Sequence, residues 1–380
     1  MPALAAMTWL QALVALALFA PGAVAPSAHL DIPSLSMFST AVFAVGVVTS
    51  FWTGGLINRI GSLRMASLCA GAVIASMALA AFGSGPALFL AGFCLGLAFG
   101  PETPASTALL GRLVTDERRP LVFSVRQTGN QIGAVCGSLA LPAIAIWLAP
   151  QWSYVAVAAC AIGGILVFEW LRPRYEGLAQ APPQLGMRAR LALVSSDRQV
   201  AALAAASMPF SGMQLALNTF FVTLGVRELG LGHLEAGAAL ACAQAGGLLG
   251  RLGWGFLAMR INSARLVLIG LGLGMAMCAA LFGLWGGTLG KSGQYALAVI
   301  FGLTASGWNG VFLAEVARLS RQDRIAETTG AVLTASYAGL LITPLLISII
   351  ETFVGLAGAF VGLALLAFGG TAALVRGGAR

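Results

Sequence analysis

Two ionisable residues, Glu102 and Arg126, lie inside long apolar runs, where they could carry charge or proton chemistry away from water. Glu102 precedes Arg112 by ten residues, which is about 15 Å along a helix and near the middle of a membrane span. An ionisable group at that depth costs about 2.5–3.5 kcal/mol, so it faces a cavity or a partner. Glu102 therefore suits a proton carrier or a cation contact, or else a fixed ion pair with Arg126.

Arg126 follows Pro120 by six residues, about 9 Å into the next apolar run. Its guanidinium can form bidentate pairs with carboxylates, which suits an anionic substrate. Pairing with Glu102, or extension of the side chain to the membrane surface, are the structural alternatives. Asn130 lies one turn further along the same helix face.

Polar residues also follow a helical spacing in the run 199–224. Ser207, Ser211, Gln214 and Asn218 are separated by four, three and four residues, so a helix places them on one face. A polar stripe in an apolar helix either lines a water-filled cavity or hydrogen-bonds neighbouring helices.

Trp308 and Asn309 stand in the middle of the run 294–316, which makes them candidates for lining a cavity. Tryptophans near span ends form interfacial belts instead, and four others fit that position: Trp147, Trp152, Trp170 and Trp285.

Motifs for catalysis, metal binding or ATP hydrolysis do not occur in the sequence. The six cysteines lie in apolar runs without a C-x-x-C pair, which is typical of small buried residues. We therefore expect no cofactor and no metal site. An intramembrane enzyme would have to rely on Glu102 and Arg126 alone.

The composition requires a membrane environment for these residues. Of the 380 residues, 59% are hydrophobic and 9% are charged, whereas a soluble domain carries roughly 25% charged residues. So few charges cannot cover the surface of a soluble protein of this size. This excludes a soluble enzyme, a nucleic-acid-binding module and a disordered chain, despite the net charge of +8.

We predict an all-α integral membrane protein with twelve transmembrane helices, because each span needs about 20 apolar residues. The apolar runs fall at 3–25, 34–57, 65–83, 87–111, 121–147, 153–171, 199–224, 234–258, 266–286, 294–316, 328–350 and 354–375.

The arginines predict the orientation of these spans. Seventeen of the 21 basic residues fall in alternate loops or at the C-terminus on the same side, and only Arg227 and Lys291 fall in the opposite loops. The positive-inside rule then places both termini in the cytoplasm. No basic residue precedes the run 3–25, so we expect an uncleaved helix there rather than a secretory signal.

Two six-helix halves are expected, 1–171 and 199–380, joined by a cytoplasmic linker at 172–198. Arg59 recurs as Arg260 at an offset of 201 residues, and several further pairs keep the same offset: Gly54/Gly255, Leu56/Leu257, Ile60/Ile261, Ser62/Ser263, Arg64/Arg265, Thr128/Thr329 and Gly129/Gly330. Parallel repeats of this kind are a transporter plan with the binding site between the halves.

The segment between the second and third predicted helices resembles the G-x-L-x-D-R-x-G-R element of the major facilitator superfamily. Its residues include Gly54, Asn58, Arg59, Gly61 and Arg64, and a second copy holds Arg251, Gly255 and Arg260. The family aspartate, which pairs with basic residues and locks the cytoplasmic gate, is replaced by Asn58 and, in the second copy, by Met259. The resemblance implies a gate that rests on other contacts or is looser, with Arg59 and Arg260 holding the cytoplasmic helix ends.

The stretches 100–106, 126–129 and 307–318 resemble a bacterial branch of permeases in that superfamily whose substrates are mostly unassigned. The resemblance implies that helices one, four, seven and ten line a central cavity. The antiporter signature of the fifth helix is incomplete, since Gly129, Gly133 and Gly137 form a glycine ladder but Pro142 comes too late.

These observations favour a monomeric secondary transporter in the bacterial cytoplasmic (inner) membrane. It would move a small polar or amphipathic solute, with Arg126 favouring an organic anion, by alternating access coupled to protons. The expected partners are the small-molecule substrate, protons and the lipid bilayer, with no nucleic acid. The alternatives are a proton-driven drug or metabolite efflux pump of the same fold, a transporter-like receptor and an intramembrane enzyme.

Overall fold

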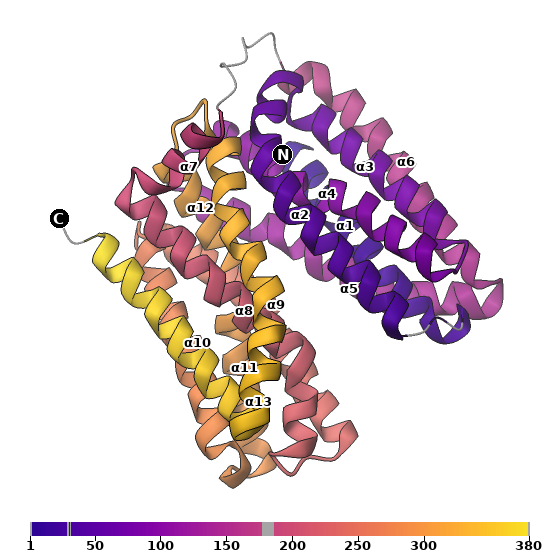
Figure 1. The fold of residues 1–380 in the computed structure, drawn as a ribbon. Coiled ribbons are helices and arrows are strands. Elements are labelled where there is room, and N and C mark those ends of the chain that lie inside the picture. The colour runs from indigo at the N-terminus through magenta and orange to yellow at the C-terminus, as the bar shows by residue number, and fades with distance from the viewer. Residues whose placement is uncertain (1, 29, 31, 177–185, 379–380) are drawn as a thin grey trace. The chain divides into compact units, whose positions relative to one another are not determined.

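The apolar runs form α-helices in the computed structural model, which describes all residues except 1, 29, 31, 177–185 and 379–380 (Figure 1). The described residues contain no strand. In the hydrocarbon core every backbone N–H and C=O must be paired within the protein, and a helix achieves this within a single segment. The predicted all-α fold class is confirmed.

The helices follow one another along the chain as α1 (Pro2–Ala28), α2 (Ile32–Ile60), α3 (Ser62–Ala80), α4 (Gly85–Leu113), α5 (Arg119–Trp147), α6 (Pro150–Tyr175), α7 (Met187–Ser195), α8 (Arg198–Arg227), α9 (His233–Arg260), α10 (Ala264–Trp285), the 3-10 turn η1 (Gly286–Thr288), α11 (Lys291–Ala305), α12 (Asn309–Leu319) and α13 (Ile325–Gly377).

Ten segments of the described chain are long and apolar enough to span a membrane. The last of them, α13, holds two spans, because Gly355 adopts a φ of 73° and interrupts the helix. α9, with 28 residues, covers the predicted run 234–258. Counting α9 and both parts of α13 gives the twelve spans predicted from the sequence.

The tenth span differs from the continuous helix predicted over 294–316, because it is broken into α11 and α12. At the break, a Cβ on Gly307 would meet the backbone of Gly250 and the Trp254 ring on α9. The indole Nε1 of Trp254 donates to the carbonyl oxygen of Leu303 at 2.8 Å. This bond satisfies a carbonyl near the end of α11, so the break is tolerated at membrane depth.

One compact unit comprises Met1–Thr115, Val125–Arg190 and Ser320–Thr334. Within it α2 packs on α4, α4 on α3, α3 on α6 and α6 on α1 (Figure 1). We call it unit 1.

Small residues allow the closest packing in unit 1. Gly92, Gly96 and Gly100 recur every fourth residue on α4, and a Cβ at any of them would collide with α2. Thr49 of α2 donates its hydroxyl to the carbonyl oxygen of Gly96 at 3.1 Å. On α5, Gly129 and Gly133 likewise approach the backbone of α1, which is the structural role expected of a glycine ladder.

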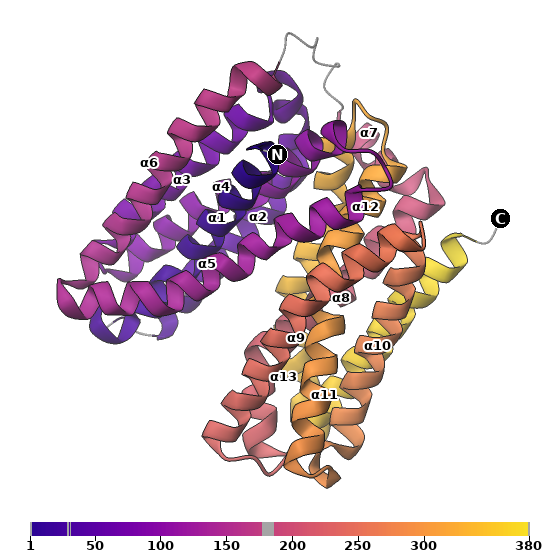
Figure 2. The ribbon, with the colours of Figure 1, turned by 180° about the vertical axis from the view of Figure 1, so that it is seen from behind.

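The other compact unit comprises Asp116–Ser124, Leu191–Leu319 and Ala335–Arg380, and we call it unit 2. Within it α9 packs on α11, α11 on α10 and α8 on α9 (Figure 2). Gly246 and Gly250 bring α9 against the backbone of α11.

Two helices contribute to both units. The first residues of α5, up to Ser124, belong to unit 2, whereas the first residues of α13, up to Thr334, belong to unit 1. The six-helix halves expected at 1–171 and 199–380 stay a prediction. In the expected linker 172–198, α6 continues to Tyr175 and α7 forms, and residues 177–185 lie outside the described residues.

Candidate functional site

Glu102 of α4 and Arg126 of α5 form a buried ion pair within unit 1. Nη2 of Arg126 donates to Oε1 of Glu102, and the residues are 0% and 5% exposed, respectively. The second carboxylate oxygen, Oε2, accepts from the hydroxyl of Thr103 at 2.8 Å. Pro101 and Pro104 flank Glu102 inside α4. Because a proline has no N–H to donate, the backbone around Glu102 makes fewer intrahelical hydrogen bonds.

The Arg126 guanidinium retains donors that the described residues do not use. Its Nε and Nη1 atoms are shielded from solvent and have no hydrogen-bond partner in the described part of the chain. A guanidinium carries five N–H donors, and buried donors left unpaired are costly. The pair with Glu102 therefore leaves Arg126 able to bind a second acceptor.

Amide side chains extend this polar region of unit 1. Gln11 of α1 donates to Oε1 of Gln127, the residue after Arg126. Asn130, one turn further along α5, is half-buried. The structure thus pairs Glu102 with Arg126 and, separately, Gln11 with Gln127.

The polar stripe of α8 makes hydrogen bonds to other helices of unit 2. Gln214 accepts from Nδ2 of Asn309 on α12 at 3.0 Å, and Asn218 accepts from Nε2 of Gln244 on α9 at 2.9 Å. Ser207 and Ser211 are both buried, and the Ser207 hydroxyl donates to the carbonyl oxygen of Ala204 on the same helix. Gln214 and Asn218 therefore make the interhelical hydrogen bonds that were one of the two roles predicted for this stripe.

Trp308 lies at the break before α12 and is 1% exposed. Its ring packs edge-to-face against Phe210 and Phe312, with centroids 5.6 and 5.1 Å apart. Its Nε1 is buried and has no partner among the described residues. Asn309 is the first residue of α12, so the two cavity candidates stand at a helix start rather than inside a helix.

The first copy of the gate motif lies at the end of unit 1 that carries arginine-rich loops. Gly54 approaches the backbone of Glu327 at the start of α13, where a Cβ would clash. Glu327 is buried and pairs with Arg324 at 2.8 Å. The Ser50 hydroxyl of α2 also contacts the start of α13, where it donates to the carbonyl oxygen of Gly330 at 3.2 Å. A buried acid therefore approaches this motif from α13, while Asn58 stands at the usual acid position.

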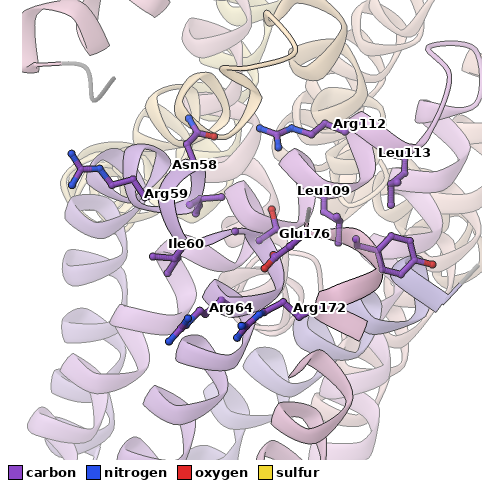
Figure 3. Close-up of a pocket in the computed structure, with 13 residues that line it drawn as sticks. Asn58, Arg59, Ile60, Arg64, Leu109, Arg112, Leu113, Arg172 and Glu176 are labelled. Atoms are coloured by element: carbon purple, nitrogen blue, oxygen red, sulfur yellow. The ribbon is translucent and has the colours of Figure 1, made fainter. Parts of the chain in front are cut away.

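Asn58, Arg59 and Arg64 line a pocket of about 380 Å³ in unit 1 (Figure 3). The carboxylate of Glu176, the residue after α6, lies within it (Figure 3). Gly61 adopts a φ of 93°, and a Cβ there would overlap that carboxylate.

Glu176 caps the N-terminus of α3, where the backbone N–H of Leu63 donates to its Oε1. Burial raises the pKa of Glu176 above its ordinary value of 4.5, while the N–H groups of Leu63 and Arg64 and the charge of Arg172 act in the opposite direction.

The second copy of the motif is packed differently in unit 2. Arg251 is 2% exposed on α9, and Gly255 approaches Ser124 at the start of α5 so closely that a Cβ would clash. Arg260 is exposed, with its guanidinium 5.4 Å from the ring centroid of Phe256. The gate roles of Arg59 and Arg260 stay a prediction.

Sequence reasoning missed Glu176 and Glu327, because both stand beside arginines in polar loop regions that normally remain hydrated. The three-residue spacing of Arg324 and Glu327 at a helix start was the available signal for Glu327. No group of three His, Cys, Asp or Glu residues that could hold a metal ion occurs in the described chain.

Comparison with known proteins identifies the family. The sequence model described as Major Facilitator Superfamily matches residues 3–344. No curated protein sequence matches the chain significantly.

Similar solved structures cover nearly the whole chain. The Escherichia coli fucose:proton symporter FucP has a TM-score of 0.80 at 14% identity, covering 99% of this chain and 98% of that chain. The human organic anion transporter MFSD10 (TETRAN) has a TM-score of 0.79 at 16% identity, covering 98% of each chain. A bacterial homologue of the iron transporter ferroportin, in its outward-facing state, has a TM-score of 0.79 at 15% identity, covering 100% and 99%. The chain therefore belongs to the major facilitator superfamily, whose members are transporters and not enzymes.

Proposed function

We propose that this transporter moves a small organic anion together with protons, and that Glu102 and Arg126 form its substrate and coupling site. The observation that carries the proposal is the state of Arg126, whose Nε and Nη1 donors are buried and unused by the described residues. A carboxylate or phosphate of a substrate supplies the acceptors that these donors lack, in the paired geometry that a guanidinium favours.

Proton coupling follows from competition for one cation. When Glu102 is ionised it occupies Nη2 of Arg126 and offsets the positive charge. When Glu102 takes up a proton, Arg126 becomes an uncompensated buried cation, and an anionic substrate restores the charge balance. Protonation of Glu102 and binding of the anion thus favour each other, as coupled transport requires.

We further propose that the protein is a monomer in the bacterial cytoplasmic membrane, with both termini in the cytoplasm. The 17-to-two distribution of basic residues between opposite loops supports this orientation. The substrate site would open to one side of the membrane at a time. The structural neighbours, at 14–16% identity, support the fold and carry no substrate assignment to this chain.

A thermal-shift screen tests the substrate class. The purified protein is heated with a panel of monocarboxylates, dicarboxylates, sugar acids, neutral sugars and lipophilic cations. A ligand that binds only the native state at about 100 times its Kd stabilises it by roughly 2.7 kcal/mol. We expect an organic acid to raise the melting temperature of the wild type and of Arg376→Gln, a control at an exposed arginine, but not of Arg126→Gln.

Stabilisation by a lipophilic cation, retained in Arg126→Gln, would contradict the anion assignment and favour the efflux-pump alternative. Stabilisation by a neutral sugar that is equal in wild type and Arg126→Gln would also contradict it.

A further inference from the structure

The pocket beside the gate motif gathers cations from several helices of unit 1. Arg59 comes from α2, Arg64 from α3, Arg112 from α4 and Arg172 from α6, and all four line the pocket together with Glu176 (Figure 3). Four arginines and one glutamate give the lining a formal charge of +3. The pocket's volume of about 380 Å³ is ample for a phosphate-sized anion.

The carboxylate of Glu176 forms no ion pair within 4 Å with any of these arginines, and it accepts hydrogen bonds from the backbone of α3 instead. The N–H groups of Leu63 and Arg64 both donate to it. Among the four arginines, Arg172 pairs with Glu169 at 2.6 Å. The other three form no ion pair with any residue that the structure describes.

An uncharged polar group of the lining also lacks a partner. Both amide atoms of Asn58 are shielded from solvent and make no hydrogen bond within the described chain. A buried amide left in this way costs free energy unless a ligand or water supplies its partners. Asn58 therefore stands in the lining with an amide that no described residue pairs.

The surroundings of the pocket favour a lipid as the source of the anion. The half-exposed Leu113 of α4 supplies apolar surface beside the arginines. On α6, Tyr175 lines the pocket and Trp170, five residues earlier, is 76% exposed. Tryptophan and tyrosine near a span end are enriched at the level of the lipid headgroups, which the exposed Trp170 fits.

We propose that this pocket binds the phosphate of an anionic phospholipid, and that its ligands include Arg64 and Arg112, which form no ion pair with any residue that the structure describes. The proposal rests on the orientation proposed above, since that orientation turns the pocket toward the anionic cytoplasmic leaflet. Arginine holds a phosphate through paired N–H donors, and basic pockets between helices at this level suit such headgroups. The site lies apart from Glu102 and Arg126 and does not depend on the transported substrate.

The test measures lipid binding in nanodiscs. The wild type, the double variant Arg64→Gln/Arg112→Gln and the control Arg188→Gln/Arg376→Gln are placed in phosphatidylcholine nanodiscs with increasing phosphatidylglycerol. The control removes the same charge from exposed arginines outside the pocket lining. The readouts are the melting temperature and the phosphatidylglycerol retained in native mass spectrometry.

We expect phosphatidylglycerol to raise the melting temperature of the wild type and the control. Its affinity should fall about ten-fold or more in the double variant, which loses two charge-assisted contacts. An equal loss of phosphatidylglycerol affinity in the control and in the double variant would overturn the site, because a general charge effect would then explain the binding.

Two further measurements test the lipid assignment and the proposed phosphate contacts separately. Inorganic phosphate added to phosphatidylcholine nanodiscs should leave the melting temperature unchanged, and a shift equal to that of phosphatidylglycerol would overturn the lipid assignment. If the glutamine variant fails to fold, Arg64→Lys/Arg112→Lys keeps both charges but not the paired donors. Wild-type lipid affinity in that variant would overturn the proposed phosphate contacts.

Discussion

The guanidinium of Arg126 donates from a single nitrogen, Nη2, to Oε1 of Glu102, although both residues are buried. A guanidinium and a carboxylate that served only to stabilise each other would be expected to use two parallel hydrogen bonds. Here Glu102 divides its oxygens between Arg126 and Thr103, and Nε and Nη1 of Arg126 have no partner in the described chain. The pair thus leaves donors of Arg126 unpaired, which supports the anion site proposed above.

Gly61 is predicted to tolerate no side chain. At a φ of 93°, an alanine would be strained, and its Cβ would overlap the Glu176 carboxylate. We expect Gly61→Ala to destabilise the protein by about 1–3 kcal/mol, measured by thermal unfolding in detergent. Gly71→Ala, on α3 with no atom near its Cβ position, is the control and should not be destabilised. Equal stability of the two variants would contradict this account of the α2–α3 turn.

Glu176 should make stability depend on pH. Because burial raises its pKa in the folded protein above the ordinary value of 4.5, the folded state binds more protons than the unfolded state between these two values. The contribution of Glu176 to stability is therefore present below the unfolded pKa and is lost as the pH rises through the folded pKa. Glu176→Gln, which keeps an acceptor for the Leu63 N–H, cannot lose a proton.

We expect Glu176→Gln to gain stability relative to the wild type as the pH rises from about 4.5 toward neutrality, measured as the difference in melting temperature. Glu228→Gln is a suitable control, because Glu228 accepts from the backbone N–H groups of Leu356 and Ala357 in unit 2. A pH-independent difference between wild type and Glu176→Gln would contradict the raised pKa of Glu176.

Gly54 and Gly255 should each be required for the packing of a helix start. A Cβ at Gly54 would displace the backbone of Glu327, and one at Gly255 would displace Ser124. We expect Gly54→Ala and Gly255→Ala to destabilise the protein by about 1–3 kcal/mol each. Gly253→Ala places its Cβ in open space and should be neutral or stabilising. If all three variants melt alike, the close approaches are not needed.

The orientation is tested by reporter fusions at residues 84, 180 and 290. The arginine distribution predicts that 84 and 290 lie in the periplasm and 180 in the cytoplasm. A cytoplasmic signal at 84 or 290, or a periplasmic signal at 180, would overturn the orientation and the membrane side assigned to the arginine pocket.

Much of the fold could be predicted because span length and apolar composition are local properties of the sequence. The break before Trp308 was not predicted, although the sequence Ser-Gly-Trp-Asn-Gly at 306–310 contains turn-forming residues. Contacts with Gly250 and Trp254 of another helix also accompany the break. Glu102 and Arg126 stood out because each is a charge within an apolar run.

The remaining site residues depend on tertiary contacts. Glu176 lies in a polar segment, and only folding brings it to the start of α3. Asn58 could be recognised as a departure from the family motif, but its lack of a partner follows from the packing around α2.

The role of Glu102 in coupling is tested most directly by comparing two transport modes of Glu102→Gln in proteoliposomes, using the anion identified by the thermal-shift screen. Because glutamine cannot exchange a proton, we predict that a pH gradient no longer drives accumulation, while exchange of the anion at equal pH continues at close to the wild-type rate. Arg126→Gln should lose both modes. Accumulation by Glu102→Gln at the wild-type level would contradict the account, because protons would then be coupled elsewhere.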